Sequence, residues 1–185
     1  MLAYLQTTAS MSGYSKPLIL LLLATLLLPF SCRRTKGYEE SKYLRWVGDI
    51  AFNPKEDDKN FVVCEEEEVK QYHNFSLGFQ YKGEKYELDR AFEQAYQSKI
   101  IKGESGLIRI RFIVNCRGET GRFRVMGMNE NYEPKAFDAP ITKQLLRITQ
   151  SLTGWKVLPN AEKPEDYYQY LIFKIKEGQL IEIMP

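Results

Sequence analysis

Hydrophobic and polar positions alternate most clearly between residues 107 and 115. After Leu107, the hydrophobic positions that recur at every second residue are Ile108, Ile110, Phe112 and Val114, and the positions between them are Arg109, Arg111 and Ile113. A period of two predicts a β-strand with one hydrophobic face. The alternation resumes at Phe123 and Val125, so the two stretches predict a β-hairpin, in whose connection Gly118 and Gly121 can take positive φ angles.

A helix and two more strands are predicted downstream. The helix is indicated by Ile141, Leu145, Ile148 and Leu152, which recur every three or four residues. Gly154 is placed to end this helix, and Trp155 to pack just beyond it. Residues 168–175 and 180–184 predict a closing pair of strands that turns at residues 176–178.

The chain before residue 106 carries weaker signals. Residues 43–52 are too hydrophobic for a free linker, so we expect them to pack on the domain. Residues 53–60 predict a solvated loop, and residues 61–64 a short strand. Residues 88–98 predict a second amphipathic helix, with Leu88, Phe92, Ala95 and Tyr96 on its hydrophobic side.

Four consecutive glutamates, Glu65–Glu68, admit two interpretations. They could bind a cation or a basic partner, or they could form the solvated first turn of a helix through Tyr72, where negative charge suits the helix dipole. We favour the helix, because four adjacent side chains cannot converge on one ion.

The order of these elements resembles the C-terminal domain of TonB-type energy transducers. The stretches that carry the resemblance are Ile110–Asn115 with Gly118, then Gly154–Pro159, then Tyr170–Ile175. The resemblance implies an α+β fold: an antiparallel sheet with a hairpin, one main amphipathic helix packed on it and closing strands. Before it we expect an N-terminal extension of helix and strand.

The family binds an extended segment of an outer-membrane receptor by adding it as a strand at the edge of the sheet. By resemblance, the strand over residues 168–175 is the docking region, and its candidate partner-binding residues are Tyr168, Tyr170, Ile172 and Lys174. Two features differ from a transducer. The chain has no Pro-rich spacer, and the strand over residues 180–184 could occupy the same edge. The tyrosines of this region could instead cap the core of the sheet.

The N-terminus resembles a bacterial lipoprotein signal of the Bacteroidetes type. Leu18–Leu28 is an apolar run that suits a signal-peptide core better than a membrane span, and Ser31 precedes Cys32 as in a lipobox, although Pro29 departs from that pattern. An uncleaved membrane anchor and a soluble secreted protein are the alternatives. We expect a signal peptide over residues 1–31 with lipidated Cys32, a tether over 32–42, the extension over 43–105 and the TonB-like domain over 106–185.

The other two cysteines, Cys64 and Cys116, would be an even pair in an oxidising compartment. They predict either a disulfide or two buried thiols, because spacing alone does not show how close they lie. One histidine, His73, and two scattered cysteines do not make a zinc site, so we expect no metal. His73 has no recognised nucleophile arrangement near it, so we expect no catalytic residue, no enzyme and no cofactor.

Charge adds little, since 26 basic and 24 acidic residues give a net charge of +2, which does not favour nucleic acid. The sequence therefore predicts a lipid-anchored binding protein on the periplasmic side of the outer membrane. Its expected partner is an outer-membrane receptor or another envelope protein. The alternatives are a shortened transducer with an uncleaved anchor, and a module that binds cell-wall glycan or a small ligand.

Overall fold

The computed structural model describes residues 48–71, 79–158 and 163–184, all within one compact unit. This part of the chain has an α+β fold, with a five-stranded sheet and two helices, as predicted. The strands are β1 (Lys70–Gln71), β2 (Gly106–Val114), β3 (Thr120–Met128), β4 (Tyr167–Lys176) and β5 (Gln179–Met184), and the helices are α2 (Glu84–Ala95) and α3 (Ala139–Ser151).

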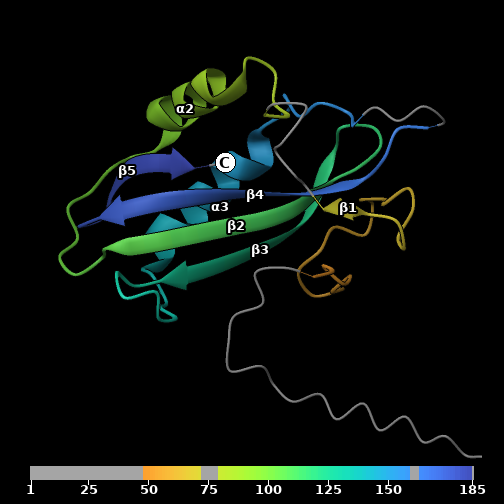
Figure 1. Cartoon of the computed structure of the whole chain (residues 1–185). Helices are drawn as coiled ribbons and strands as arrows, with labels where there is room; N and C mark the ends of the chain where they lie inside the picture. Colours follow the sequence, from red (N-terminus) through yellow and green to blue (C-terminus); the bar gives the residue numbers. More distant parts are fainter. Residues whose placement is uncertain (1–47, 72–78, 159–162, 185) are drawn as a thin grey trace, which may run out of the picture. The chain divides into compact units, whose positions relative to one another are not determined.

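The sheet is built around β4 and β2, which pair along their whole length (Figure 1). β3 pairs with the other side of β2 and forms one edge of the sheet. The other side of β4 is shared by β5 and the short β1. β1 runs parallel to β4, so the sheet is mixed, whereas the sequence predicted an antiparallel one.

The predicted hairpin is confirmed by β2 and β3, but its glycines have different roles. Gly118 has a φ of 78°, as the tight connection requires. Gly121 does not have a positive φ; Arg122 does, at 55°, beside a bulge in the pairing of the two strands. Gly121 is needed for close packing, because a Cβ atom there would collide with the Phe61 ring.

The main hydrophobic core lies between the sheet and the two helices. Every second residue of β2, from Ile108 to Val114, is fully buried in it, and α3 contributes Ile141, Leu145 and Ile148. α3 ends at Ser151, so Gly154 does not end it as predicted. Gly154 instead leaves room for the Tyr81 ring. Trp155 packs in this core, as predicted.

Two predictions for the N-terminal extension were wrong. Residues 61–64 are not a strand, and Glu65–Glu68 do not begin a helix; a turn there leads into β1. Local charge favoured a helix, but the backbone N–H of Lys70 bonds to Asp166 C=O at 2.9 Å, which draws the chain alongside β4. α2 confirms the second amphipathic helix, four residues earlier at its start than predicted, and buries Leu88 and Phe92 in the main core.

A second, smaller core lies on the face of the sheet that the helices do not cover. Ile50 and Val63 of the extension pack there against Ile113 of β2 and Tyr168 of β4. The expectation that residues 43–52 pack on the domain is confirmed for the described residue Ile50. The N-terminal extension is therefore part of the same folded unit as the sheet.

Candidate functional site

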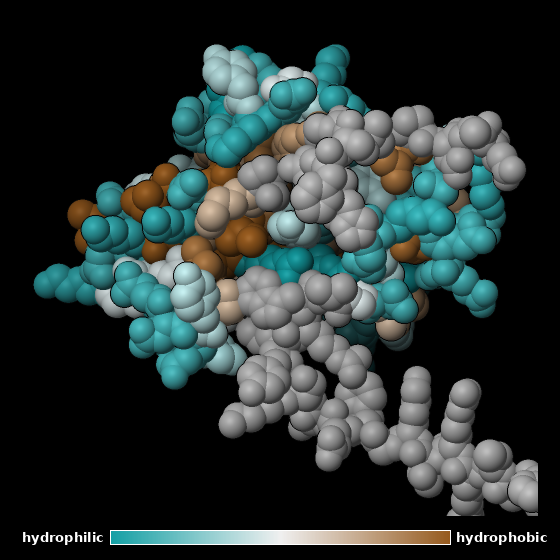
Figure 2. All heavy atoms as spheres, viewed as in Figure 1, coloured by the Kyte–Doolittle hydropathy of each residue, from teal (hydrophilic) through white to brown (hydrophobic). Residues whose placement is uncertain are grey.

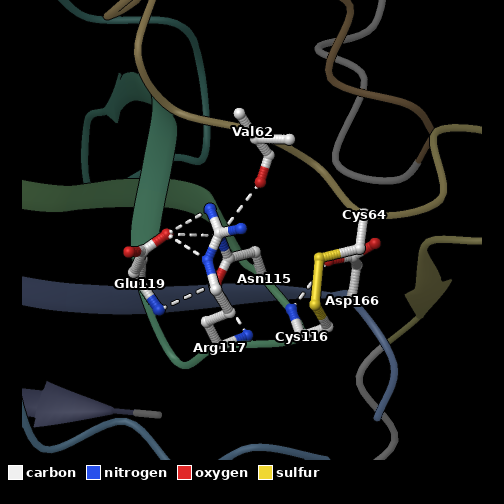
Figure 3. A network of polar contacts seen from close by, with 7 residues as sticks. All are labelled: Val62, Cys64, Asn115, Cys116, Arg117, Glu119 and Asp166. Atoms are coloured by element: carbon white, nitrogen blue, oxygen red, sulfur yellow. Dashed lines mark hydrogen bonds and ion pairs between the residues drawn. A yellow bond between two sulfur atoms is a disulfide. The ribbon is translucent and has the colours of Figure 1, made fainter. Parts of the chain in front are cut away.

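Cys64 and Cys116 are joined through their Sγ atoms, 2.08 Å apart, which answers the question that the sequence left open (Figure 3). The carboxylate of Asp166 holds both cysteine segments in place. Its Oδ1 accepts a hydrogen bond of 2.8 Å from Cys116 N–H, and its Oδ2 accepts one of 2.7 Å from Glu65 N–H. Asp166 is 2% exposed. This network ties the extension to the end of the hairpin and to the start of β4.

Asp166 and the two cysteines also form a cluster of potential metal-ligating groups within 4.8 Å of one another. The sequence did not indicate this cluster, because the three residues are far apart along the chain. Sulfurs joined to one another are not thiolate ligands. Both carboxylate oxygens of Asp166 already accept backbone hydrogen bonds. The arrangement therefore suits a structural clamp.

Asn115 closes the hairpin connection beside this clamp (Figure 3). It is fully buried, and its side-chain oxygen accepts hydrogen bonds from Arg117 N–H at 3.0 Å and from Glu119 N–H at 2.9 Å. Its amide nitrogen donates to Val62 C=O at 2.9 Å and to the Glu119 carboxylate at 2.8 Å. The Arg117 guanidinium holds the pKa of Glu119 below its usual value, with help from Asn115.

Two arginines of β3 hold residues 50–57 of the extension against the sheet. Arg124 donates hydrogen bonds of 2.7 Å to each carboxylate oxygen of Asp57 and one of 2.8 Å to Ala51 C=O. Arg122 binds the Glu66 carboxylate through two bonds and Ile50 C=O at 3.1 Å. The hydrogen bonds from Arg124 lower the pKa of Asp57, against an opposing effect of burial.

The predicted docking strand, β4, has no free edge for most of its length. It pairs with β2 from Tyr167 to Ile175, and on its other side β1 pairs with Tyr167 and Tyr168 and β5 with residues 172–176. Little of this strand is therefore open to a partner, and the assignment of partner binding to Tyr168, Tyr170, Ile172 and Lys174 stays a prediction. The suspicion that the extra C-terminal strand occupies this edge is confirmed by β5.

The tyrosines of β4 are largely packing residues. Tyr167 lies in the main core and Tyr168 in the smaller one, so their rings lie on opposite faces of the sheet. Burial raises the pKa of Tyr168, whose ring lies 4.6 Å from the Arg111 guanidinium carbon. Arg109 lies 4.5 Å from the centre of the half-buried Tyr170 ring. These rings do not form the exposed tyrosine groove that the glycan-binding alternative needs.

β3 is one open edge of the sheet; the other is the outer side of β5, which pairs only with β4 among the described strands. Gly127 C=O points away from β2, because it accepts a hydrogen bond of 2.9 Å from Lys135 N–H. The polar groups of an antiparallel strand point alternately to its two sides, so the N–H and C=O of Val125 also point away from β2. Val125 is 37% exposed, and no described segment pairs with it on that side. Arg124 Nη1 donates a hydrogen bond of 2.9 Å to the neighbouring Phe123 C=O.

Hollows lie on both sides of this edge, and both are lined by Val125 of β3 and Leu146 of α3. The larger is a groove of about 1150 Å³ between β3 and residues 48–58. It contains Arg111, Arg122 and Arg124 together with Asp49, Glu56, Asp57 and Asp58. Figure 2 shows that the helix-free face carries hydrophilic residues among hydrophobic ones.

Sequence reasoning missed Asp166, Asp57 and Val125 as site residues. A signal for part of this site was present: four arginines, at 109, 111, 122 and 124, face away from the core on the two hairpin strands. Arginines on one face of a hairpin are costly to bury unless acidic residues elsewhere in the chain pair with them. Nothing in the sequence indicated which acids would supply them.

Several predictions lie outside the described residues. They are the signal peptide, the lipidated Cys32, the tether and the prediction for His73. Neither α2 nor α3 is long and apolar enough to cross a membrane, a finding that covers the described residues alone. Comparisons with models of protein families, with curated proteins and with solved structures found no match. The TonB-like resemblance stays a prediction.

Proposed function

We propose that this protein is a lipid-anchored binding protein of the cell envelope, which binds an extended segment of another envelope protein by strand addition at β3. The single observation that carries the proposal is the outward N–H and C=O of Val125 at the open edge. An extended peptide gains affinity by bonding such groups. The β4 edge, which the sequence favoured, is occupied by β1 and β5 for most of its length.

The surroundings of Val125 suit an added strand. Hollows on both faces of the edge leave space for side chains that alternate along an extended peptide. Leu146 lines both hollows, and Phe52 is exposed in the larger one, so apolar peptide side chains have partners on either side. The backbone hydrogen bonds of Val125 would give affinity, and the two hollows would give selectivity among peptide side chains.

A peptide-display selection tests the strand addition. Ten-residue random peptides are selected on the full chain, and the binders are measured on a Val125→Pro variant. Proline removes the outward N–H but no bond to β2, so the fold is kept at an edge position. Val125→Thr is the matched control, because it alters the side chain and keeps the N–H.

We expect selected peptides to bind the parent chain and Val125→Thr, and to bind Val125→Pro at least about tenfold more weakly, a loss of about 1.4 kcal/mol. Equal binding to all three proteins would overturn strand addition at β3.

The anchor has its own test, which is the intact mass of the mature protein from membranes of its native host. A chain that begins at Cys32 with added acyl mass supports the lipid anchor. A chain that retains residues before Cys32 would contradict it and would favour the alternative of a shortened transducer with an uncleaved anchor.

A further inference from the structure

Arg111 is a buried cation without an ion-pair partner among the described residues. It is 6% exposed, and its buried Nη2 makes no hydrogen bond. The contact that compensates its charge is the face of the Tyr168 ring, 4.6 Å from the guanidinium carbon. Burial lowers the pKa of this guanidinium. A cation held in this way is costly to the folded chain, because its lost hydration is not replaced by hydrogen bonds.

The two arginines that share the groove with Arg111 are both ion-paired. Arg124 holds Asp57 and Arg122 holds Glu66, each through both ends of the guanidinium. Each of these two arginines has an ion-pair partner, so Arg111 is the arginine of the groove that lacks one among the described residues.

Asp49 is the acidic residue that most influences Arg111 without pairing with it. It attracts the guanidinium at a distance, but no ion pair joins the two side chains. The Asp49 carboxylate instead accepts a hydrogen bond of 3.2 Å from the Tyr168 hydroxyl. The Arg111 side chain lines the groove, and its buried Nη2 has no hydrogen-bond acceptor.

We propose that this groove binds the carboxylate of a small amphipathic ligand, with the carboxylate on Arg111 and the apolar body against Phe52 and Met126. A carboxylate matches the planar fork of an arginine, which can donate two parallel hydrogen bonds to it. The apolar wall comes from these two side chains, which line the same groove. A groove of about 1150 Å³ accommodates such a molecule.

The acidic residues of the groove limit the negative charge that a ligand can carry there. One unpaired guanidinium balances one carboxylate, while Asp49, Glu56 and Asp58 on the same groove repel further negative charge. A phosphate dianion is therefore disfavoured. The site does not depend on strand addition, because it uses the side chain of Arg111 on β2 and not the backbone of β3.

The test compares carboxylates with their own primary amides, which have the same shape and no charge. The probes are hexanoate, phenylacetate and indole-3-acetate, each against its amide, and binding to the full chain is measured by ligand-observed NMR and calorimetry. We expect at least one carboxylate to bind with a Kd below about 10 mM, and its amide to bind at least about tenfold more weakly.

Three variants locate the binding. Arg111→Met should remove the preference for carboxylate over amide, whereas Lys143→Met, which removes a cation outside this groove, should leave it unchanged. Asp49→Asn should tighten carboxylate binding, because it removes a negative charge near Arg111. This third variant keeps the test informative if Arg111→Met does not fold.

The proposal would be overturned by any of three results. They are no carboxylate binding below about 10 mM, equal binding of acid and amide, and a carboxylate preference that survives Arg111→Met. A phosphate probe, phenyl phosphate, that binds more tightly than phenylacetate would also contradict the selection of a single negative charge.

Discussion

Arg124 and Asp57 are joined by two hydrogen bonds of 2.7 Å, one to each carboxylate oxygen. The pair connects strand β3 to the loop over residues 53–60, which the sequence predicted to be merely solvated. The Asp57 side chain is 2% exposed and that of Arg124 is 26% exposed. This ion pair is therefore one of the contacts that fix one wall of the groove beside the open edge.

The pair predicts a pH dependence of stability. The hydrogen bonds from Arg124 lower the pKa of Asp57 in the folded chain below its unfolded value of about 3.9. The contribution of the pair is therefore fully present above that value, and is lost as pH falls through the folded pKa. Denaturant unfolding at pH 7 and about pH 3 should show that the free energy of unfolding falls more for the parent chain than for Asp57→Asn. An equal fall in the free energy of unfolding for both proteins would contradict this role of Asp57.

Replacement by methionine should change the free energy of unfolding in opposite directions at Arg111 and at Arg124. Arg111→Met removes an unpaired buried charge and should raise the free energy of unfolding by about 1 kcal/mol. Arg124→Met leaves the Asp57 carboxylate buried and unpaired, and should lower it by about 2 kcal/mol. Urea unfolding of the two variants measures both changes. A destabilised Arg111→Met protein would show that Arg111 contributes to the fold itself.

Asp166 should be essential to the seating of the disulfide. In Asp166→Asn, an NH₂ group faces either Cys116 N–H or Glu65 N–H in place of an acceptor, and the unmatched donors should cost about 1–3 kcal/mol. Denaturant unfolding of the oxidised proteins measures this loss. Glu93→Gln, the same change on the exposed side of α2, should have little effect. A similar stability for both variants would contradict the clamp.

Removal of the disulfide should loosen the extension first. The cysteines are 52 residues apart, and a loop of that size constrains the unfolded chain by about 4 kcal/mol in the chain-entropy model. The double variant Cys64→Ser, Cys116→Ser should unfold at lower denaturant and be cut by protease within residues 48–71 before the sheet is cut. Cleavage of residues 48–71 and of the sheet at the same rate would show that the extension has no separate stability.

Periodicity identified the hairpin, α3 and the closing strands, because each has a hydrophobic face that recurs at the spacing of its secondary structure. The α+β fold could therefore be predicted from local pattern. The helix predicted to begin at Glu65–Glu68 was wrong. Their charge favoured a helix start, but contacts with the distant Asp166 placed the chain beside β4. Contacts between residues about a hundred positions apart have no local signal.

The candidate site was less predictable than the fold. Resemblance pointed to β4, whose edge is largely occupied by β1 and β5, while β3 and the outer side of β5 are the open edges. The four hairpin arginines were visible in the sequence, yet which of them lack an acidic partner depends on where Asp57 and Glu66 fold. Strand order and ion-pair partners are both set by tertiary packing, which is why local pattern did not identify Arg111 or Val125.

Strand addition at β3 is tested most directly by photo-crosslinking in cells of the native host. A benzophenone amino acid is placed at Val125 on the open edge, or at Lys174 on β4, which is also exposed but has neighbours on both sides. We expect an adduct to an envelope protein from Val125 and not from Lys174, with the crosslink mapped to an extended segment of that protein. Adducts from Lys174 alone, or from neither position, would contradict the account.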